Sequence, residues 1–195
     1  MKTYCLMCMT GHESKVVRIV NRCAPELTIL SPVRILPEKL GGQWRNREKA
    51  LLPGYLFLYT DLEDQPRIRQ MSHRFYKYLS YELGSRELFG NDKTYAEWIL
   101  AHQGQLQPSL IFATGDQISV LDGPLADRIG TIVKLDRHKR RAWIQFEFDG
   151  QQRMVCLGAE FLERLDVEAE RRVSDLLITT TSIGAHNKNS ALTIA

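Results

Sequence analysis

The chain has 195 residues, 44% hydrophobic and 25% charged, which is typical of a folded globular protein and excludes a disordered or fibrous one. Its formal net charge is only +3, so an anionic partner would have to be recognised by a local cluster of basic residues. There is neither an apolar run long enough to cross a bilayer nor a signal peptide, so we expect a cytoplasmic protein without a membrane partner.

Residues 3–9 are apolar and predict a buried strand. Thr10 and Glu13 match a capping box, which predicts that a helix begins there and ends before Pro25. Residues spaced three and four apart should form its buried stripe: Val16, Ile19, Val20 and Cys23.

Cys5 and Cys8 have CxxC spacing within the predicted strand. Residues three apart in a strand point to opposite faces, so these thiols would not share a metal or a disulfide without distortion. We therefore expect buried thiols in a reduced compartment, with no metal site and no cofactor.

Residues 27–36 look extended, and Gly41 and Gly42 mark a turn inside a basic stretch that reaches Lys49. Between 34 and 49, five cationic and two acidic residues leave a local charge of +3. A solvated hairpin and a nucleic-acid surface both fit this stretch. A Pro-Gly bend then introduces an aromatic-rich strand over 51–59.

Residues 63–83 interleave cations with aromatic rings, a composition that suits a half-buried helix or a surface on which bases stack. A further helix is expected from Asp92. Residues 103–109 then lose all periodicity and predict a linker at a domain boundary.

Short stretches of apolar alternation follow, and Asp149 and Gly150 predict a tight hairpin turn between two of them. Closing such strands on themselves removes exposed edges, so we expect a small closed or nearly closed β-barrel. The expected strands cover 117–120, 131–135, 142–148 and 154–157, with a helix over 166–178 and a mobile tail after it.

Positive charge is concentrated between 127 and 141, where six cationic and two acidic residues leave a surplus of four. Its centre, 137–141, lies between two expected strands and would project into water as a hairpin tip. Such a tip suits a polyphosphate, although a plain polar turn is the alternative. The residues expected to bind RNA are Arg128, Lys134, Arg137, His138, Lys139, Arg140 and Arg141.

Two groups of motifs resemble the NusG family. Residues 116–120 with 123–127 and 130–132 are similar to its KOW module, and residues 4–13 with 52–55 are similar to its N-terminal domain. Within the family, residues 135–142 resemble specialised antiterminators of the LoaP type, whose KOW module binds an RNA hairpin. No catalytic motif is present, so we do not expect an enzyme, and a thiol redox enzyme using Cys5 and Cys8 is the third choice.

The resemblance implies an α+β protein in which an antiparallel sheet flanked by helices precedes a small SH3-like β-barrel. The polymerase-binding domain would span 1–105, the linker 106–113, the RNA-binding KOW barrel 114–165, and the C-terminal helix and tail 166–195. It also implies that the first domain docks on the clamp helices of bacterial RNA polymerase through Met7, Leu52, Tyr55 and Phe57.

The implied function is transcription elongation and antitermination by a monomer that binds polymerase, a nascent RNA hairpin and the non-template DNA strand. The alternative is a general NusG-like elongation factor or adaptor, whose barrel binds a termination factor or a ribosomal protein. An exposed apolar face on the barrel would favour this alternative.

Overall fold

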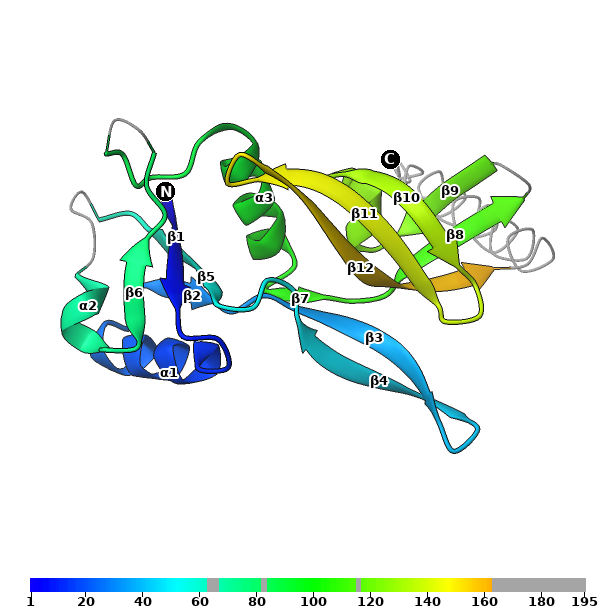
Figure 1. Ribbon diagram of the computed structural model, residues 1–195, viewed down its shortest axis with the longest axis horizontal. Coiled ribbons are helices and arrows are strands. Elements are labelled where there is room, and N and C mark those ends of the chain that lie inside the picture. The colour runs from blue at the N-terminus through cyan, green and yellow to red at the C-terminus, as the bar shows by residue number, and fades with distance from the viewer. Residues whose placement is uncertain (63–66, 82–83, 115–116, 163–195) are drawn as a thin grey trace, which may run out of the picture.

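In a computed structural model, residues 1–62, 67–81, 84–114 and 117–162 are described (Figure 1). The helix expected over 166–178 and the tail after it lie outside these residues. Among the described residues, none of the helices is both long and apolar enough to span a bilayer. The elements are mixed sheets with few helices, as expected for an α+β protein.

The first sheet has the strand order β2-β5-β1-β6, and its neighbours pair antiparallel. These strands are β1 (Lys2–Cys8), β2 (Thr28–Leu30), β5 (Tyr55–Thr60) and β6 (Phe75–Tyr78). The amphipathic helix α1 (Glu13–Cys23) covers one face, where Val16 and Val20 are fully buried among the sheet residues. The expected stripe is thus confirmed at its centre, but Cys23 at its end is exposed.

The predicted capping box is wrong. His12 occupies the N-cap of α1 and makes no side-chain capping bond. The Glu13 carboxylate instead accepts a 2.7 Å hydrogen bond from the backbone N–H of Gly54. Burial opposes its ionisation, but backbone N–H groups of Glu13, Gly54 and Gly11 outweigh burial and lower the pKa of Glu13.

A long hairpin extends from the N-terminal half, built from β3 (Val33–Leu40) and β4 (Gln43–Ala50). Gly41 and Gly42 turn it with φ of 57° and 82°, the left-handed conformations that a two-residue hairpin turn needs. This confirms the hairpin expected from the sequence. The short strand β7 (Gln105–Leu106) pairs parallel to β3 on its other edge.

A helix over 63–83 is one of the two interpretations that the sequence left open, and the described part of this stretch does not support it. It forms only the four-residue helix α2 (Ile68–Met71) before strand β6. The helix expected from Asp92 is confirmed as α3 (Gly90–Ala101), which buries Tyr95, Trp98 and Ile99.

The second sheet has the order β10-β11-β12-β8-β9, and we refer to residues 109–162 as the C-terminal sheet. Ala142, Ile144, Phe146 and Phe148 alternate inward as predicted. Residues 106–113 do not form a free linker, because β8 pairs parallel to β12. The strands are β8 (Ser109–Thr114), β9 (Gln117–Asp122), β10 (Thr131–Asp136), β11 (Arg141–Phe148) and β12 (Gln151–Leu162), with the 3-10 helix η1 (Pro124–Asp127) between β9 and β10.

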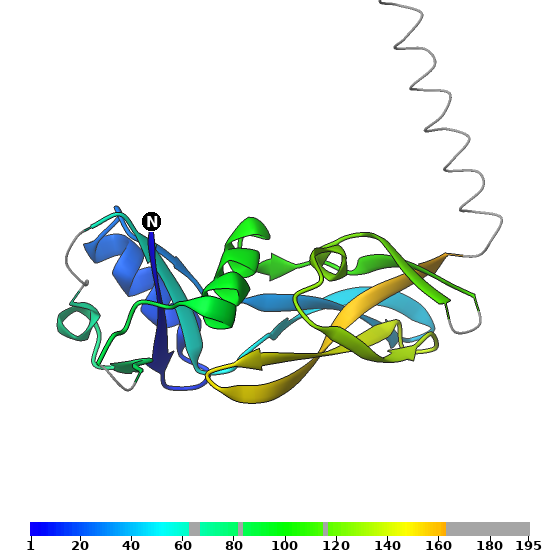
Figure 2. The same ribbon diagram turned by 90° about the horizontal axis from the view of Figure 1, so that it is seen from above.

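One apolar core joins the two halves of the chain. Phe57 and Tyr59 of β5, Tyr95 of α3 and Phe146 and Phe148 of β11 belong to the same buried cluster. Figures 1 and 2 both show α3 between the first sheet and the C-terminal sheet. The C-terminal sheet therefore packs directly on the N-terminal half.

Candidate functional site

The residues expected to contact polymerase lie together but are largely covered. Met7 and Tyr55 are direct partners across β1 and β5, and both are half-buried. Leu52 is 9% exposed and Phe57 is fully buried. The structure thus brings the four side chains to one region of the first sheet, whereas their role in binding stays a prediction.

The cover is the end of the β11–β12 hairpin. The Phe148 ring lies 6.1 Å from Tyr55, 5.7 Å from Phe57 and 5.2 Å from Tyr95, measured between centroids. Phe146 stacks on Tyr95 at 4.5 Å with an interplanar angle of 9°. These are favourable aromatic geometries, so the cover is a packed interface.

Polar contacts along the same interface also hold the C-terminal sheet against the N-terminal half. The Asp92 carboxylate accepts from the hydroxyl of Tyr81 at 2.7 Å and from the backbone N–H of Asp149 at 2.9 Å. The indole N–H of Trp98 donates to the carbonyl of Pro124 at 3.1 Å. Further out, His102 Nε2 and the Asp127 carboxylate lie 2.6 Å apart.

Most of the residues expected to bind RNA lie in or beside the turn between β10 and β11, whereas Arg128 precedes β10 at its other end. Arg137, His138 and Lys139 are exposed, and the Lys139 backbone N–H is held by the Asp136 carboxylate at 2.9 Å. Lys134, also exposed, lies over the Trp143 ring at 5.2 Å. Arg128 is exposed in a left-handed conformation at the end of η1, with φ of 56°.

Arg140 and Arg141 are engaged with the N-terminal half. The Arg141 side chain is buried, and its guanidinium donates to the carbonyls of Pro37 at 2.6 Å and Lys139 at 2.9 Å. The Arg140 guanidinium lies 4.4 Å from the centroid of the Trp44 ring on β4. In this arrangement Arg141 is a structural residue, because it satisfies buried carbonyls.

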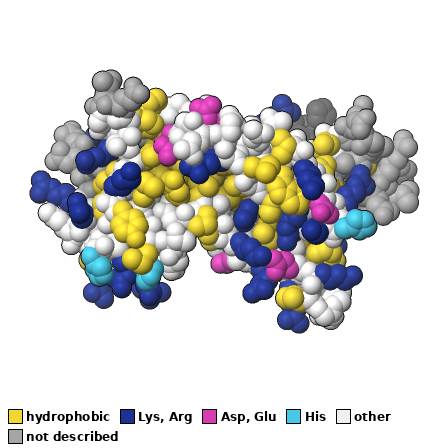
Figure 3. Space-filling view, in the orientation of Figure 1, with side chains coloured by type: hydrophobic (Ala, Val, Ile, Leu, Met, Phe, Trp, Pro, Cys, Tyr) yellow, Lys and Arg dark blue, Asp and Glu magenta, His cyan; other side chains and the backbone are white. Residues whose placement is uncertain are grey.

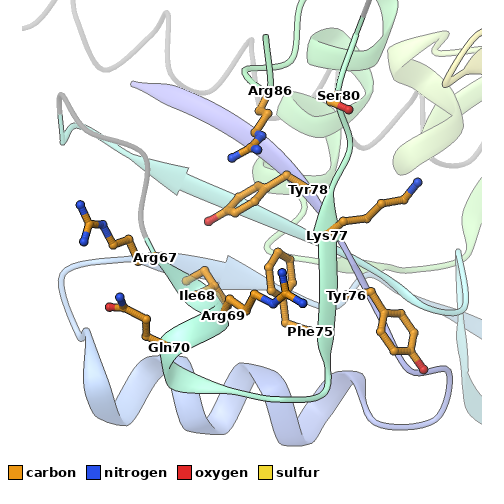
Figure 4. A pocket seen from close by; sticks show the side chains of 10 residues that line it. All are labelled: Arg67, Ile68, Arg69, Gln70, Phe75, Tyr76, Lys77, Tyr78, Ser80 and Arg86. Atoms are coloured by element: carbon orange, nitrogen blue, oxygen red, sulfur yellow. The ribbon is translucent and has the colours of Figure 1, made fainter. Parts of the chain in front are cut away.

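A basic groove lies along the edge strand β6, in the stretch of interleaved cations and aromatic residues for which the sequence left a base-stacking surface open (Figure 4). It encloses about 600 Å³ between α2, β6 and Arg86. Tyr76, which is 53% exposed, and Lys77 lie on its rim, and the Arg86 guanidinium lies 5.9 Å over the Tyr78 ring. Interleaved cations and aromatic residues were the sequence signal for it. The cations that line it are Arg67, Arg69, Lys77 and Arg86.

The C-terminal sheet also exposes apolar side chains. A depression of about 540 Å³ is lined by Val120, Leu125 and Ile132, with Ile118 43% exposed at its edge. Exposed apolar clusters of this kind mark interaction sites.

The two CxxC thiols are poor candidates for redox chemistry. They face different apolar clusters, as predicted for opposite sides of β1. Burial, reinforced by Glu13, raises the pKa of Cys8 to about 11, and burial also raises the pKa of Cys5. A reactive cysteine needs a lowered pKa.

The chain is similar to known proteins in sequence and in structure. No protein-family model matches the chain. The transcription termination/antitermination protein NusG of Vibrio cholerae is 27% identical over 143 residues, which cover 71% of this chain and 78% of that protein. A solved structure described as "Domain interaction in Thermotoga maritima NusG" aligns with a TM-score of 0.46 at 19% identity, covering 80% of this chain and 93% of that one.

The curated relative, by its name, acts in transcription termination and antitermination, and the similarity to it extends over most of this chain.

Proposed function

We propose that the chain is a non-enzymatic transcription elongation and antitermination factor that binds bacterial RNA polymerase through its N-terminal half. The observation that carries this proposal is the similarity to Vibrio cholerae NusG over 71% of the chain. An aromatic cluster around Tyr55 and Phe57 supports it, because such clusters serve as anchors in protein interfaces.

Docking through this cluster requires the C-terminal sheet to move away, since Phe148 occupies the space over Tyr55 and Phe57. We call the arrangement of the structure closed and the uncovered one open. Polymerase would select the open form, so its apparent affinity is reduced in proportion to the open fraction.

The second part of the proposal is that the turn at 137–140 holds a nascent RNA hairpin, as in specialised paralogues of the LoaP type. Its support is the group of exposed cations at 137–139, which would release counterions on binding phosphates. Arg141 is left out of this role because its guanidinium is buried. Non-template DNA would lie in the groove along β6, where Tyr76 offers a ring for stacking.

A second candidate function is an adaptor whose C-terminal sheet binds a protein such as a termination factor or a ribosomal protein. The apolar depression beside Ile118 favours it. Binding of a protein at this depression would be insensitive to salt, whereas RNA binding through the turn would weaken as the salt concentration rises.

The polymerase proposal is tested with Tyr55→Ala in a chain that also carries Phe148→Ala. The second substitution removes the ring that covers Tyr55, so a change in affinity reports on Tyr55 itself. We expect the affinity for core RNA polymerase to fall about tenfold or more, as for an aromatic anchor. Tyr76→Ala in the same background is the control, because this exposed tyrosine lies on β6 outside the cluster. Equal affinities for the two variants would contradict the docking role.

The RNA proposal is tested with the double variant Arg137→Gln and Lys139→Gln. The plot of log affinity against log salt for an RNA hairpin should flatten by about 0.7 to 0.9 per lost phosphate contact. An unchanged slope would remove the turn from RNA binding and leave the adaptor as the better function.

A further inference from the structure

A second basic hairpin lies beside the turn at 137–140. The exposed strand β4 and the end of β3 carry Lys39, Arg45, Arg47 and Lys49. The β3–β4 hairpin runs along the C-terminal sheet in Figure 1, and β3 is in contact with β12. In Figure 3, Lys and Arg side chains gather over the region where this hairpin and the β10–β11 turn lie in Figure 1.

Two contacts join the hairpins directly. Arg140 stacks on Trp44 at 4.4 Å, and Arg141 donates to the carbonyl of Pro37 at 2.6 Å. Arg141 also acts at a distance on Glu38: the hydrogen bond from Lys49 is the largest cause that lowers the pKa of Glu38, and the charges of Lys49, Arg47 and Arg141 add to it. These contacts place the turn directly beside the hairpin that carries the cations of β4.

The charge of this surface exceeds that of the whole chain. Residues 38–49 and 136–140 carry seven cationic and three acidic residues, a surplus of four, against +3 for all 195 residues. Two of the three carboxylates are already engaged, since Glu38 pairs with Lys49 and Arg47, and Asp136 accepts from the backbone of Lys139. Bringing these cations together costs self-repulsion, which a polyanion would relieve.

We infer that β4 and the turn together form a composite RNA-binding surface, which is complete only in the closed form. This inference rests on the proposed RNA-binding function and extends it to the N-terminal half. A folded RNA fits this surface because RNA helices are recognised through phosphates and shape, which a broad array of cations can contact. Trp44, which is 37% exposed under Arg140, adds a cation–π pair at the junction.

The test uses the full chain and a 20-base-pair RNA hairpin as the probe. The variant Lys39→Gln, Arg45→Gln and Arg47→Gln removes three exposed cations and leaves the Glu38–Lys49 pair in place. The control Lys15→Gln, Arg18→Gln and Arg22→Gln removes three exposed cations from α1, so both variants have the same net charge. Thermal melts of both variants confirm that each is folded.

The β4 variant should flatten the salt dependence of RNA affinity by about 2 to 3 in slope, at about 0.7 to 0.9 for each lost contact, and the α1 control should not. In the unmodified chain, photo-crosslinking should attach the probe to residues 43–50 as well as to the turn. A DNA hairpin of the same sequence, run in parallel, separates recognition of RNA from attraction of any polyphosphate.

Each outcome decides a different point. If the turn variant flattens the slope and the β4 variant does not, the composite surface is refuted while the proposed RNA function stands. If neither variant changes the slope, both fail. If the β4 and α1 variants lose RNA affinity equally, the effect is one of net charge and the inference is overturned. Equal affinity for the DNA hairpin and the RNA hairpin would overturn it as well.

Discussion

Replacing Phe148 by alanine should open the chain without unfolding it. The ring is fully buried, and all three aromatic rings that it contacts, those of Tyr55, Phe57 and Tyr95, belong to the N-terminal half. The loss therefore weakens the interface between the two halves.

The size of the effect follows from the burial. Truncating a buried phenylalanine costs about 3 to 5 kcal/mol, and each 1.4 kcal/mol is a factor of ten. The ratio of closed to open molecules should fall roughly 100- to 4,000-fold. The apparent affinity for polymerase should rise with the open fraction until that fraction approaches one.

The assay is the affinity of the full-length variant for core RNA polymerase, together with hydrogen exchange of the Asp149 amide, whose N–H is bonded to Asp92 across the interface. Phe75→Ala is the matched control, because Phe75 is also a buried phenylalanine but belongs to the cluster under α1. It should lower stability without raising the affinity. If Phe148→Ala leaves polymerase affinity unchanged while the Asp149 amide becomes exchangeable, the covered face is not the docking face.

Two further predictions concern stability. Because the pKa of Glu13 is lowered in the folded chain, its carboxylate stabilises the fold above the unfolded pKa of about 4.3 and loses this effect as pH falls through the folded value. Glu13→Gln should therefore cost about 1 to 3 kcal/mol near neutral pH and much less in acid, measured by urea unfolding at several pH values; a cost independent of pH would contradict this origin. Gly123 has φ of 85° and ψ of −175°, and an added Cβ would lie 2.8 Å from the Cα of Ser109. Gly123→Ala should lower the melting temperature more than Gly150→Ala, where φ is 60° and no atom lies within 4 Å, and equal shifts would refute the steric reason.

Local patterns in the sequence predicted the local elements well. The alternation of Ala142, Ile144, Phe146 and Phe148 identified the buried face of β11, because a strand repeats every two residues. Gly41 and Gly42 identified the turn of the β3–β4 hairpin, because few other residues adopt its left-handed conformations.

Long-range partners were beyond such patterns. Alternation shows that Phe148 is buried but not that it is buried against Tyr55 and Phe57, more than 90 residues earlier. Glu13 fitted a capping box, yet the N–H of Gly54 competes for its carboxylate and holds it. The sequence placed Arg141 among the cations of a solvated hairpin tip. In the structure it is a buried structural residue, because its guanidinium donates to the carbonyl of Pro37, which the sequence pattern did not place nearby.

The interface between the N-terminal half and the C-terminal sheet couples the binding of the two proposed ligands, RNA and polymerase. RNA on the composite surface favours the closed form and polymerase favours the open form, so each must weaken the other by the same factor. Couplings of this kind are typically 5- to 150-fold, roughly 1 to 3 kcal/mol. A nascent RNA is attached to the polymerase that made it, which presents the docking site at an effective concentration on the order of millimolar. For the polymerase that carries the RNA hairpin, this effective concentration can offset the loss of affinity caused by the coupling. A polymerase free in solution has no such compensation. The closed interface would thus restrict docking to transcription complexes that display the RNA.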